Sequence, residues 1–190
     1  NGFIAPKKVS EMKKLFTDAK ISLLYGVLGA EFLSILDFFE ITKEDIMTIE
    51  EGNGILVGNK IKNIEIEIDK ETKELMVKGE NVVSKYLNSE EEPERWYKTG
   101  DTGYINEKNQ LFLFGKIKDK IEIGEKIYYP STIETIFSFF EEIETAKITV
   151  KDEKLYLYVK KNQEYEGSLS ENIKINKLKE KFDIFEIVEN

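Results

Sequence analysis

The sequence predicts an α+β fold, because strand patterns and helix patterns both occur along the chain. Residues 64–69 read IEIEID, an alternation of apolar and acidic side chains that is typical of a half-buried strand. Residues 102–105 and 110–114 predict a hairpin across the polar residues between them. Two more strands are predicted at residues 143–150 and 155–159. A helix is predicted before them, with apolar side chains on one face: Ile133, Ile136, Phe137 and Phe140.

The N-terminal part of the chain predicts a helix followed by strands. Apolar residues recur at helical spacing from Val9 to Ala19, and residues 21–25 predict a short buried strand. Residues 32–39 are apolar enough for a strand or a helix, and their aromatic content favours a strand. Residues 50–54 read EEGNG, which indicates a turn, and residues 55–58 predict a strand after it.

The C-terminal part predicts a compact unit of helices on one sheet. Ser131 and Glu134 have the spacing of a capping box, in which the hydroxyl and the carboxylate each satisfy a free backbone donor. Residues 120–123 predict a strand, residues 170–182 a helix and residues 184–188 a last strand. Asn109 suits a left-handed turn position in the hairpin that ends at residue 114.

Composition excludes several classes of function. The chain has 190 residues, of which 28 are basic and 37 acidic, and the net charge of -9 argues against nucleic acid as the main partner. It has no cysteine and no histidine, so it holds no disulfide and no Ser-His or Cys-His pair. Glu65, Glu67 and Asp69 are expected to be a solvated face and not a metal site. No apolar run is long enough to span a membrane, and the lack of cysteine fits a cytoplasmic location.

Three motifs follow one another between Trp96 and Glu134. Residues 97–101 read YKTGD, residues 115–119 read GKIKD and residues 130–134 read PSTIE. This ordered series resembles the adenylate-forming enzymes, which include acyl-CoA synthetases, adenylation domains of peptide synthetases and luciferases. In that family a TGD loop and a hairpin precede Gly-Arg-x-x-Asp, a glycine-containing turn and Pro-x-x-Ile-Glu. TGD alone is weak evidence, whereas the whole series is specific.

The resemblance implies a nucleotide site at Asp101 and Lys116. One carboxylate has two acceptor oxygens and can accept hydrogen bonds from both ribose hydroxyls, which is the role implied for Asp101. Gly100 lets the backbone turn tightly and approach a ligand. Lys116 stands where the family has arginine, so it keeps the charge but loses the forked donor geometry. The alternative is a plain turn and a solvated surface charge, and the ordered pair favours nucleotide binding.

Residues 25–31 read YGVLGAE and resemble the family's Tyr-Gly-x-Thr-Glu. The resemblance implies that Tyr25 packs on the adenine, with Gly26 beside it. Leu28 and Gly29 replace the polar pair that contacts phosphate and magnesium, and Glu31 lies two positions late. A half-buried strand-end aromatic is an equally good account of Tyr25.

The resemblance also implies a domain organisation. A small distorted β-barrel-like subdomain, to which residues 74–79 and 81–88 belong, ends a large N-terminal lobe at residue 118. Leu113 would face the nucleotide there, or else belong to the barrel core. A mobile α+β domain would then span residues 119–190, with its hinge at Asp119. The charged residues 89–95 are expected to form a solvated linker.

The implied activity is that of an ATP-dependent acid–thiol ligase. A carboxylic acid and ATP would give acyl-AMP and pyrophosphate, and the acyl group would pass to the thiol of CoA or of a carrier protein. ATP, Mg2+ and CoA are the implied cofactors, and residues 124–130 weakly favour a fatty acid as substrate. The chain starts abruptly, which indicates a piece of a longer protein.

Two features support a second hypothesis, a catalytically degenerate homologue that acts as a nucleotide-binding or protein-interaction module. The YGVLGAE segment lacks the polar pair, and no Gly-Lys pattern that could carry a catalytic lysine follows Phe182. The family's phosphate-gripping loop is also not in this sequence. We therefore expect no catalytic residue and no metal ligand in the chain, and no activity from the chain alone.

Overall fold

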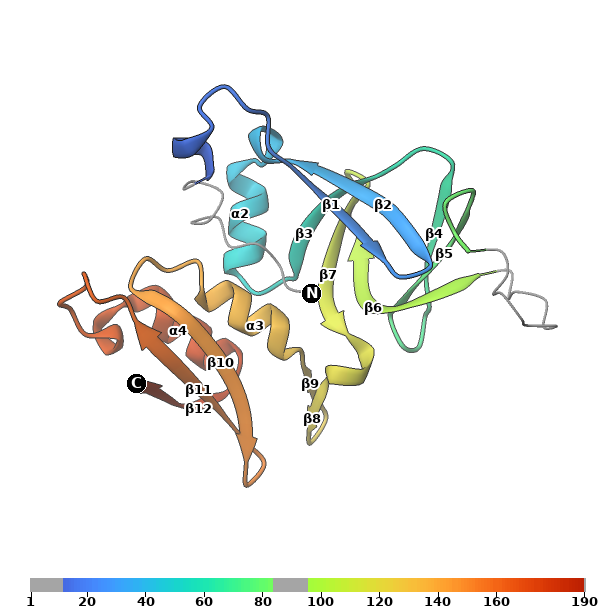
Figure 1. Ribbon diagram of the computed structural model, residues 1–190. Coiled ribbons are helices and arrows are strands. Elements are labelled where there is room, and N and C mark those ends of the chain that lie inside the picture. The colour runs from blue at the N-terminus through green and yellow to red at the C-terminus, as the bar shows by residue number, and fades with distance from the viewer. Residues whose placement is uncertain (1–11, 84–95, 190) are drawn as a thin grey trace. The chain divides into compact units, whose positions relative to one another are not determined.

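The computed structural model describes residues 12–83 and 96–189 and divides the chain into two compact units (Figure 1). The sheet unit comprises residues 20–46 and 54–118. The C-terminal unit comprises residues 119–190, residues 47–53 and the residues before Lys20. The predicted linker at 89–95, and the start of the helix predicted from Val9, lie outside the described residues.

A seven-stranded antiparallel sheet forms the sheet unit, in the order β1-β2-β3-β7-β6-β5-β4 (Figure 1). The strand predictions for residues 32–39, 64–69 and the hairpin that ends at residue 114 are confirmed. The strands are β1 (Ser22–Val27), β2 (Ala30–Asp37), β3 (Ile55–Lys60), β4 (Ile64–Ile68), β5 (Glu74–Gly79), β6 (Tyr97–Ile105) and β7 (Gln110–Lys116).

The sheet curls, so that its two ends share a core. Ala30 and Leu33 of β2 pack with Ile64 of β4 and Val77 of β5, and all four are buried. One isolated bridge joins Ala30 to Val82, beyond the end of β5. The α+β class is confirmed, but no ladder joins β1 to β4 in the described chain. The expected small barrel is therefore an open, curled sheet.

The helix α2 (Lys43–Glu50) follows a short 3-10 turn η1 (Phe38–Glu40) and was not predicted. Thr42 and Asp45 cap it reciprocally. The Asp45 carboxylate accepts from the Thr42 backbone N–H at 2.9 Å, and the Thr42 hydroxyl accepts from the Asp45 backbone N–H at 3.2 Å. Thr-x-x-Asp is a capping-box spacing, so the sequence did contain a helix-start signal here.

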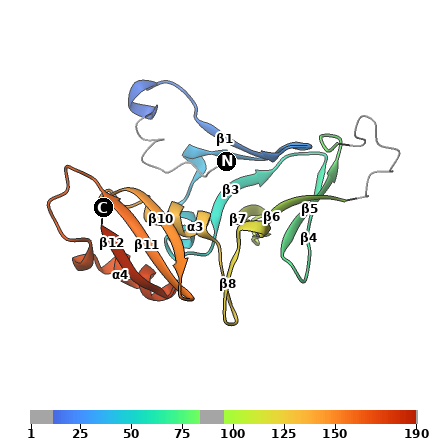
Figure 2. The same cartoon turned by 60° about the horizontal axis from the view of Figure 1, so that its bottom comes forward.

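The C-terminal unit holds a two-stranded and a three-stranded sheet (Figure 2). In the three-stranded sheet, β11 pairs antiparallel with β10 and parallel with β12. Helix α3 packs against β10 and α4 against β12. The elements are η2 (Ile117–Asp119), β8 (Ile121–Ile123), β9 (Lys126–Tyr128), α3 (Pro130–Phe137), β10 (Ile143–Lys151), β11 (Lys154–Lys161), η3 (Leu169–Glu171), α4 (Ile173–Lys181) and β12 (Ile184–Glu189).

The predicted capping box at Ser131 and Glu134 is wrong. Pro130 already occupies the first helical position of α3, so Ser131 lies inside the first turn and the N-cap is Tyr129, without a side-chain cap. Glu134 instead ties the helix to the sheet, because its Oε1 accepts from the Ile148 backbone N–H at 2.9 Å. Ile133, Ile136 and Phe137 are buried, as the predicted apolar face requires.

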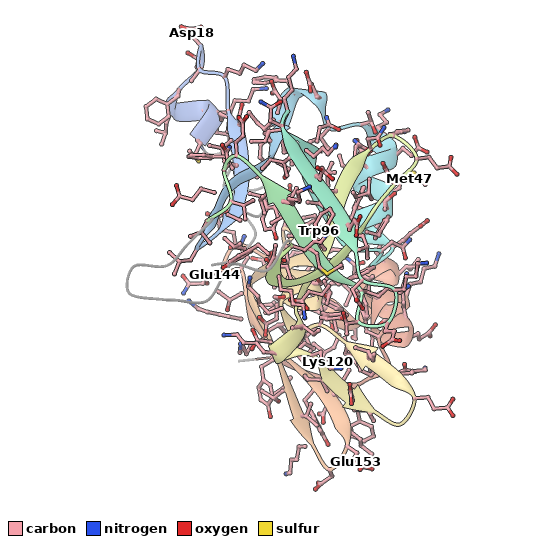
Figure 3. The ribbon with its side chains drawn as sticks, turned by 90° about the vertical axis from the view of Figure 1, so that its right-hand side faces the viewer. Asp18, Met47, Trp96, Lys120, Glu144 and Glu153 are labelled. Carbon is pink, nitrogen blue, oxygen red and sulfur yellow. The ribbon has the colours of Figure 1, made fainter. Side chains whose placement is uncertain are left out.

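Two tight turns use left-handed backbone. Asn109 adopts φ 60° in the β6–β7 turn, as predicted. In the β10–β11 turn, Asp152 and Glu153 adopt φ 50° and 55°, and Glu153 lies at the tip of that hairpin (Figure 3). Both central residues with positive φ indicate a type I′ turn, which normally uses asparagine and glycine.

Candidate nucleotide site

Asp101 and Lys116 lie directly opposite one another in the β6–β7 ladder. The Lys116 ammonium is 2.8 Å from Oδ2 of Asp101 and donates more weakly to the Thr99 carbonyl at 3.4 Å. Asp101 is only 6% exposed, so this is a largely buried carboxylate with its cation beside it. The spacing between the two sequence motifs therefore has a structural cause, because cross-strand partners on one face are neighbours.

Tyr25 of β1 completes the cluster. Its hydroxyl donates to Oδ2 of Asp101 at 2.7 Å, so both described side-chain partners of Asp101 use the same oxygen. Burial raises the pKa of the Tyr25 hydroxyl well above its usual range, and the Asp101 charge raises it further. Tyr25 consequently stays protonated and remains a donor. The structure brings together these three residues of the sequence-predicted site.

Gly26 and Leu113, the other two predicted site residues, are explained by packing. A Cβ on Gly26 would lie 2.7 Å from the Phe32 backbone nitrogen, so the close approach of β2 requires glycine there. Leu113 is 2% exposed in β7, opposite Ile55 and Gly103. This placement fits the sheet-core alternative for Leu113.

The segment after Gly26 offers little to a phosphate. Leu28 and Gly29 form the turn between β1 and β2, where Leu28 is 91% exposed and Gly29 adopts φ 91°. Glu31 follows as an exposed residue of β2. In the part of the chain that the structure describes, no group of three or more acidic, His or Cys side chains could hold a metal ion. No described helix is long and apolar enough to cross a membrane.

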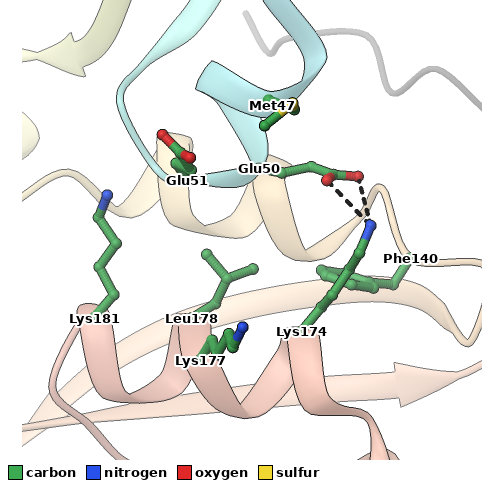
Figure 4. Close-up of a pocket in the computed structure, with 8 residues that line it drawn as sticks. All are labelled: Met47, Glu50, Glu51, Phe140, Lys174, Lys177, Leu178 and Lys181. Carbon is green, nitrogen blue, oxygen red and sulfur yellow. Dashed lines mark hydrogen bonds and ion pairs between the residues drawn. The ribbon is translucent and has the colours of Figure 1, made fainter. Parts of the chain in front are cut away.

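A separate hollow of about 320 Å³ lies in the C-terminal unit (Figure 4). Two of its lining residues form an ion pair, in which the Lys174 ammonium is 3.1 Å from the Glu50 carboxylate. None of the sequence-predicted site residues lines it. Its lining residues are Met47, Glu50, Glu51, Phe140, Lys174, Lys177, Leu178 and Lys181.

Sequence reasoning missed a polar cluster at Asp183, in the turn before β12. Its Oδ2 accepts from the Lys126 ammonium at 2.6 Å and from the Tyr128 hydroxyl at 2.7 Å. These hydrogen bonds hold the pKa of Asp183 below its usual range. Burial of the Tyr128 hydroxyl, together with its hydrogen bond to the Asp183 carboxylate and the charge of that carboxylate, raises the pKa of Tyr128 to about 12. The cluster ties the β8–β9 hairpin to the end of α4.

Curated proteins with similar sequences are CoA ligases. The chain is 31% identical over 105 residues to 2-succinylbenzoate–CoA ligase of Enterococcus faecalis. This match covers 48% of this chain and 21% of that protein. It is 36% identical over 85 residues to the 2-succinylbenzoate–CoA ligase of Bacillus pumilus, and this match covers 42% of this chain and 18% of that protein. The chain thus spans about a fifth of the relatives it matches. No family model matches it.

Solved structures with a similar fold are adenylate-forming enzymes. A mutant of amide bond synthetase McbA from Marinactinospora thermotolerans has a TM-score of 0.76 at 15% identity, over 100% of this chain and 42% of that one. Unliganded O-succinylbenzoate CoA synthetase (MenE) from Bacillus subtilis has a TM-score of 0.70 at 20% identity, and the match covers 100% of this chain and 43% of that one. The structure of the same enzyme with ATP and magnesium ion has a TM-score of 0.68 at 18% identity, and the match covers 100% of this chain and 41% of that one.

The ordered motifs, the identity to CoA ligases and the shared fold lead to one conclusion. The chain resembles the C-terminal part of an adenylate-forming, acyl-CoA synthetase-like enzyme, in sequence over about half of its length and in fold over all of it.

Proposed function

We propose that the protein containing this chain is an ATP-dependent acid–CoA ligase. It forms an acyl-adenylate and pyrophosphate from a carboxylic acid and ATP, and then passes the acyl group to the thiol of CoA. The observation that carries this proposal is the buried Asp101 carboxylate, held by Lys116 at 2.8 Å and by the Tyr25 hydroxyl at 2.7 Å.

Asp101 would bind the ribose of ATP and of AMP. Its Oδ2 accepts from Tyr25 and Lys116, and its Oδ1 offers two further lone pairs to the ribose hydroxyls. Lys116 compensates the buried negative charge before the nucleotide arrives. The ring of Tyr25 offers an apolar face to the adenine while its hydroxyl stays on Asp101. Such contacts bind substrate and transition state about equally, so they serve affinity more than rate.

The magnesium-bound phosphates need other groups. Glu31 stands alone and exposed on β2, and the described residues contain no cluster that fits Mg2+. On this proposal the chain contributes the nucleoside side of the site, and residues outside the described chain hold the metal and the phosphates.

The relatives' names support CoA as the thiol but leave the acid open. They are named as 2-succinylbenzoate–CoA ligases, and one solved neighbour, MenE from Bacillus subtilis, holds the acyl-adenylate OSB-AMP. A fatty acid, which residues 124–130 weakly favoured, finds no support in these names. An aromatic keto acid of the 2-succinylbenzoate kind is the first candidate. Location in the cytoplasm stays a prediction that rests on the lack of cysteine.

We also propose a mobile joint at Asp119. The chain passes between its two units at four points, and the last of them, between Lys118 and Asp119, falls within the short 3-10 turn η2. Residues in such turns can absorb large backbone changes. Rotation of residues 119–190 about this joint would separate the adenylation step from the thioester step.

The exposed Leu28 favours a second candidate, a degenerate homologue that binds nucleotide without catalysis, because Leu28 occupies the first position of the polar pair found in the family. Acid-dependent pyrophosphate exchange with ATP separates the two. The full-length protein should exchange pyrophosphate with 2-succinylbenzoate or a fatty acid present, and residues 1–190 alone should not. AMP binding without exchange by the full-length protein would favour the degenerate homologue. Absence of both would contradict both.

A further inference from the structure

We propose that Glu74 is a positioning residue for the nucleotide site, because its carboxylate fixes the backbone bulge that presents Asp101. Oε1 of Glu74 accepts a hydrogen bond from the Gly100 backbone N–H at 3.0 Å. The described side-chain partners of the Asp101 carboxylate are Tyr25 and Lys116, whereas the Glu74 carboxylate accepts from the backbone, so we assign Glu74 an action through the backbone. The proposal rests on the nucleotide-binding role proposed for Asp101.

The bulge is visible in the pairing of β5 with β6. Glu74 pairs with Thr102 and Met76 pairs with Lys98, so that residues 99–101 of β6 face Leu75 alone. Three residues cannot all continue the backbone ladder against one. Bulges of this kind redirect side chains, and they occur often beside active sites.

Side chains replace the missing ladder bonds. The Thr99 hydroxyl donates to the Leu75 carbonyl at 2.9 Å and accepts from the Asp101 backbone N–H at 3.1 Å. The Glu74 carboxylate accepts from the N–H of Gly100. A carboxylate acceptor makes this hydrogen bond stronger than a neutral acceptor would.

Gly100 is the residue of the bulge that most needs an anchor. It adopts φ 71°, and a Cβ built there would meet nothing within 4 Å, so its backbone conformation and not its surroundings calls for glycine. Glycine has the greatest backbone freedom of any residue. Without the bond to Glu74, the segment between Thr99 and Asp101 would sample more conformations, and the carboxylate of Asp101 would be presented less often in its binding orientation.

The charge of Glu74 distinguishes a positioning role from direct binding of the nucleotide. A second carboxylate near an anionic nucleotide repels it, so Glu74 has no value as a direct ligand of phosphate. If its role is to accept the Gly100 N–H, then Glu74→Gln, which keeps the acceptor oxygen, should retain most of the nucleotide affinity. Glu74→Ala should lose it. Thr99 is a poorer probe because it is buried, and its loss would disturb the core.

The test compares Glu74→Ala, Glu74→Gln and a control, Glu67→Ala, which removes an exposed carboxylate from β4 of the same sheet. Amide hydrogen exchange of Gly100, AMP titration by calorimetry and thermal unfolding are measured on each. Loss of one charge-assisted hydrogen bond predicts about tenfold faster Gly100 exchange and about tenfold weaker AMP binding for Glu74→Ala. Glu74→Gln should recover most of both, and Glu67→Ala should change neither.

Three results would overturn the proposal: Gly100 exchange unchanged in Glu74→Ala, Glu74→Gln as impaired as Glu74→Ala, or faster exchange throughout the sheet, which would mean a general role in stability. If the unsubstituted protein binds no AMP, the proposed nucleotide site fails. The Gly100 exchange rates still decide whether Glu74 fixes the bulge.

Discussion

The hydroxyl of Tyr25 donates a 2.7 Å hydrogen bond to the carboxylate of Asp101, which joins β1 to β6 across 76 residues of sequence. The bond leaves the ring of Tyr25 oriented by a polar contact at its tip and makes Asp101 the common partner of a tyrosine and a lysine. The three side chains can therefore be tested one at a time.

Replacing Asp101 with alanine should weaken AMP binding by about 1.5–3 kcal/mol, the usual contribution of hydrogen bonds to a charged group. Stability should change little, because the freed Lys116 side chain is 31% exposed and can be solvated. Isothermal calorimetry with AMP measures the first and thermal unfolding the second. Unchanged affinity would remove Asp101 from the site.

The variant Lys116→Arg should bind AMP several-fold more tightly. A guanidinium keeps the charge beside Asp101 and adds a planar fork of donors that can reach the carboxylate and the ribose together. The matched variant Lys116→Met keeps the length of the side chain but removes the charge, and it should bind more weakly. Equal affinities for the three proteins would show that Lys116 does not contribute to binding.

The raised tyrosine pKa values predict a loss of stability in alkali. Tyr25 and Tyr128 keep their protons in the folded state at a pH where an unfolded tyrosine, with a pKa of about 10, loses its proton. The stability that these two protonated tyrosines contribute is therefore complete below pH 10 and is lost as pH rises above it. For Tyr25 the free energy of unfolding should fall by about 1.4 kcal/mol per pH unit in that window.

Urea unfolding at pH 9 and pH 11 measures this loss. Tyr25→Phe should reduce the difference between the two pH values, because phenylalanine has no proton to lose. Tyr158→Phe, on an exposed tyrosine of β11, is the control and should leave the difference as it is. An unaltered pH dependence in Tyr25→Phe would contradict the pKa shift.

Glu153→Gly should stabilise the C-terminal unit by about 1 kcal/mol. Glu153 adopts φ 55° in the β10–β11 turn, a conformation that costs a residue with a Cβ roughly 1–2 kcal/mol. Glu153→Ala keeps the Cβ and should change stability little. Chemical denaturation of the three proteins compares them, and a destabilised glycine variant would show that the turn carries no such cost.

Limited trypsin digestion should cut the chain first at Lys118 or Lys120, which flank the proposed hinge and are both exposed. Mass spectrometry should then identify two protected pieces. The double variant Lys118→Gln with Lys120→Gln should resist this cut and otherwise digest as before. Resistance of the unsubstituted chain at both lysines would place the joint elsewhere.

Local patterns predicted the strands better than the helix starts. The alternation in residues 64–69 specified β4, because a strand with one wet face leaves a period of two in the sequence. Helix α2 was not predicted from the sequence, although Thr42 and Asp45 have capping-box spacing. The same spacing at Ser131 and Glu134 gives a wrong N-cap, because Pro130 already occupies the first position of that helix. A capping signal thus depends on the residue before it.

The site was predictable only in part. The order of the motifs nominated Asp101 and Lys116, and the hairpin register accounts for their contact. The bond from Tyr25 depends on how the sheet brings β1 near β6, which no local pattern encodes. Glu74 was assigned to a strand, and its role appears only with the mismatch in residue number between β5 and β6.

The open sheet has two unlike edges. At one, β4 carries Glu65 and Glu67 along its exposed face, and such charges discourage a further strand from adding. At the other, β1 has no charged residue, and its exposed Leu24 pairs with the exposed Ile35 of β2. An uncharged edge beside exposed apolar side chains is a template for strand addition. The chain on its own should therefore self-associate at high concentration through β1, and a single lysine in place of Leu24 should suppress it.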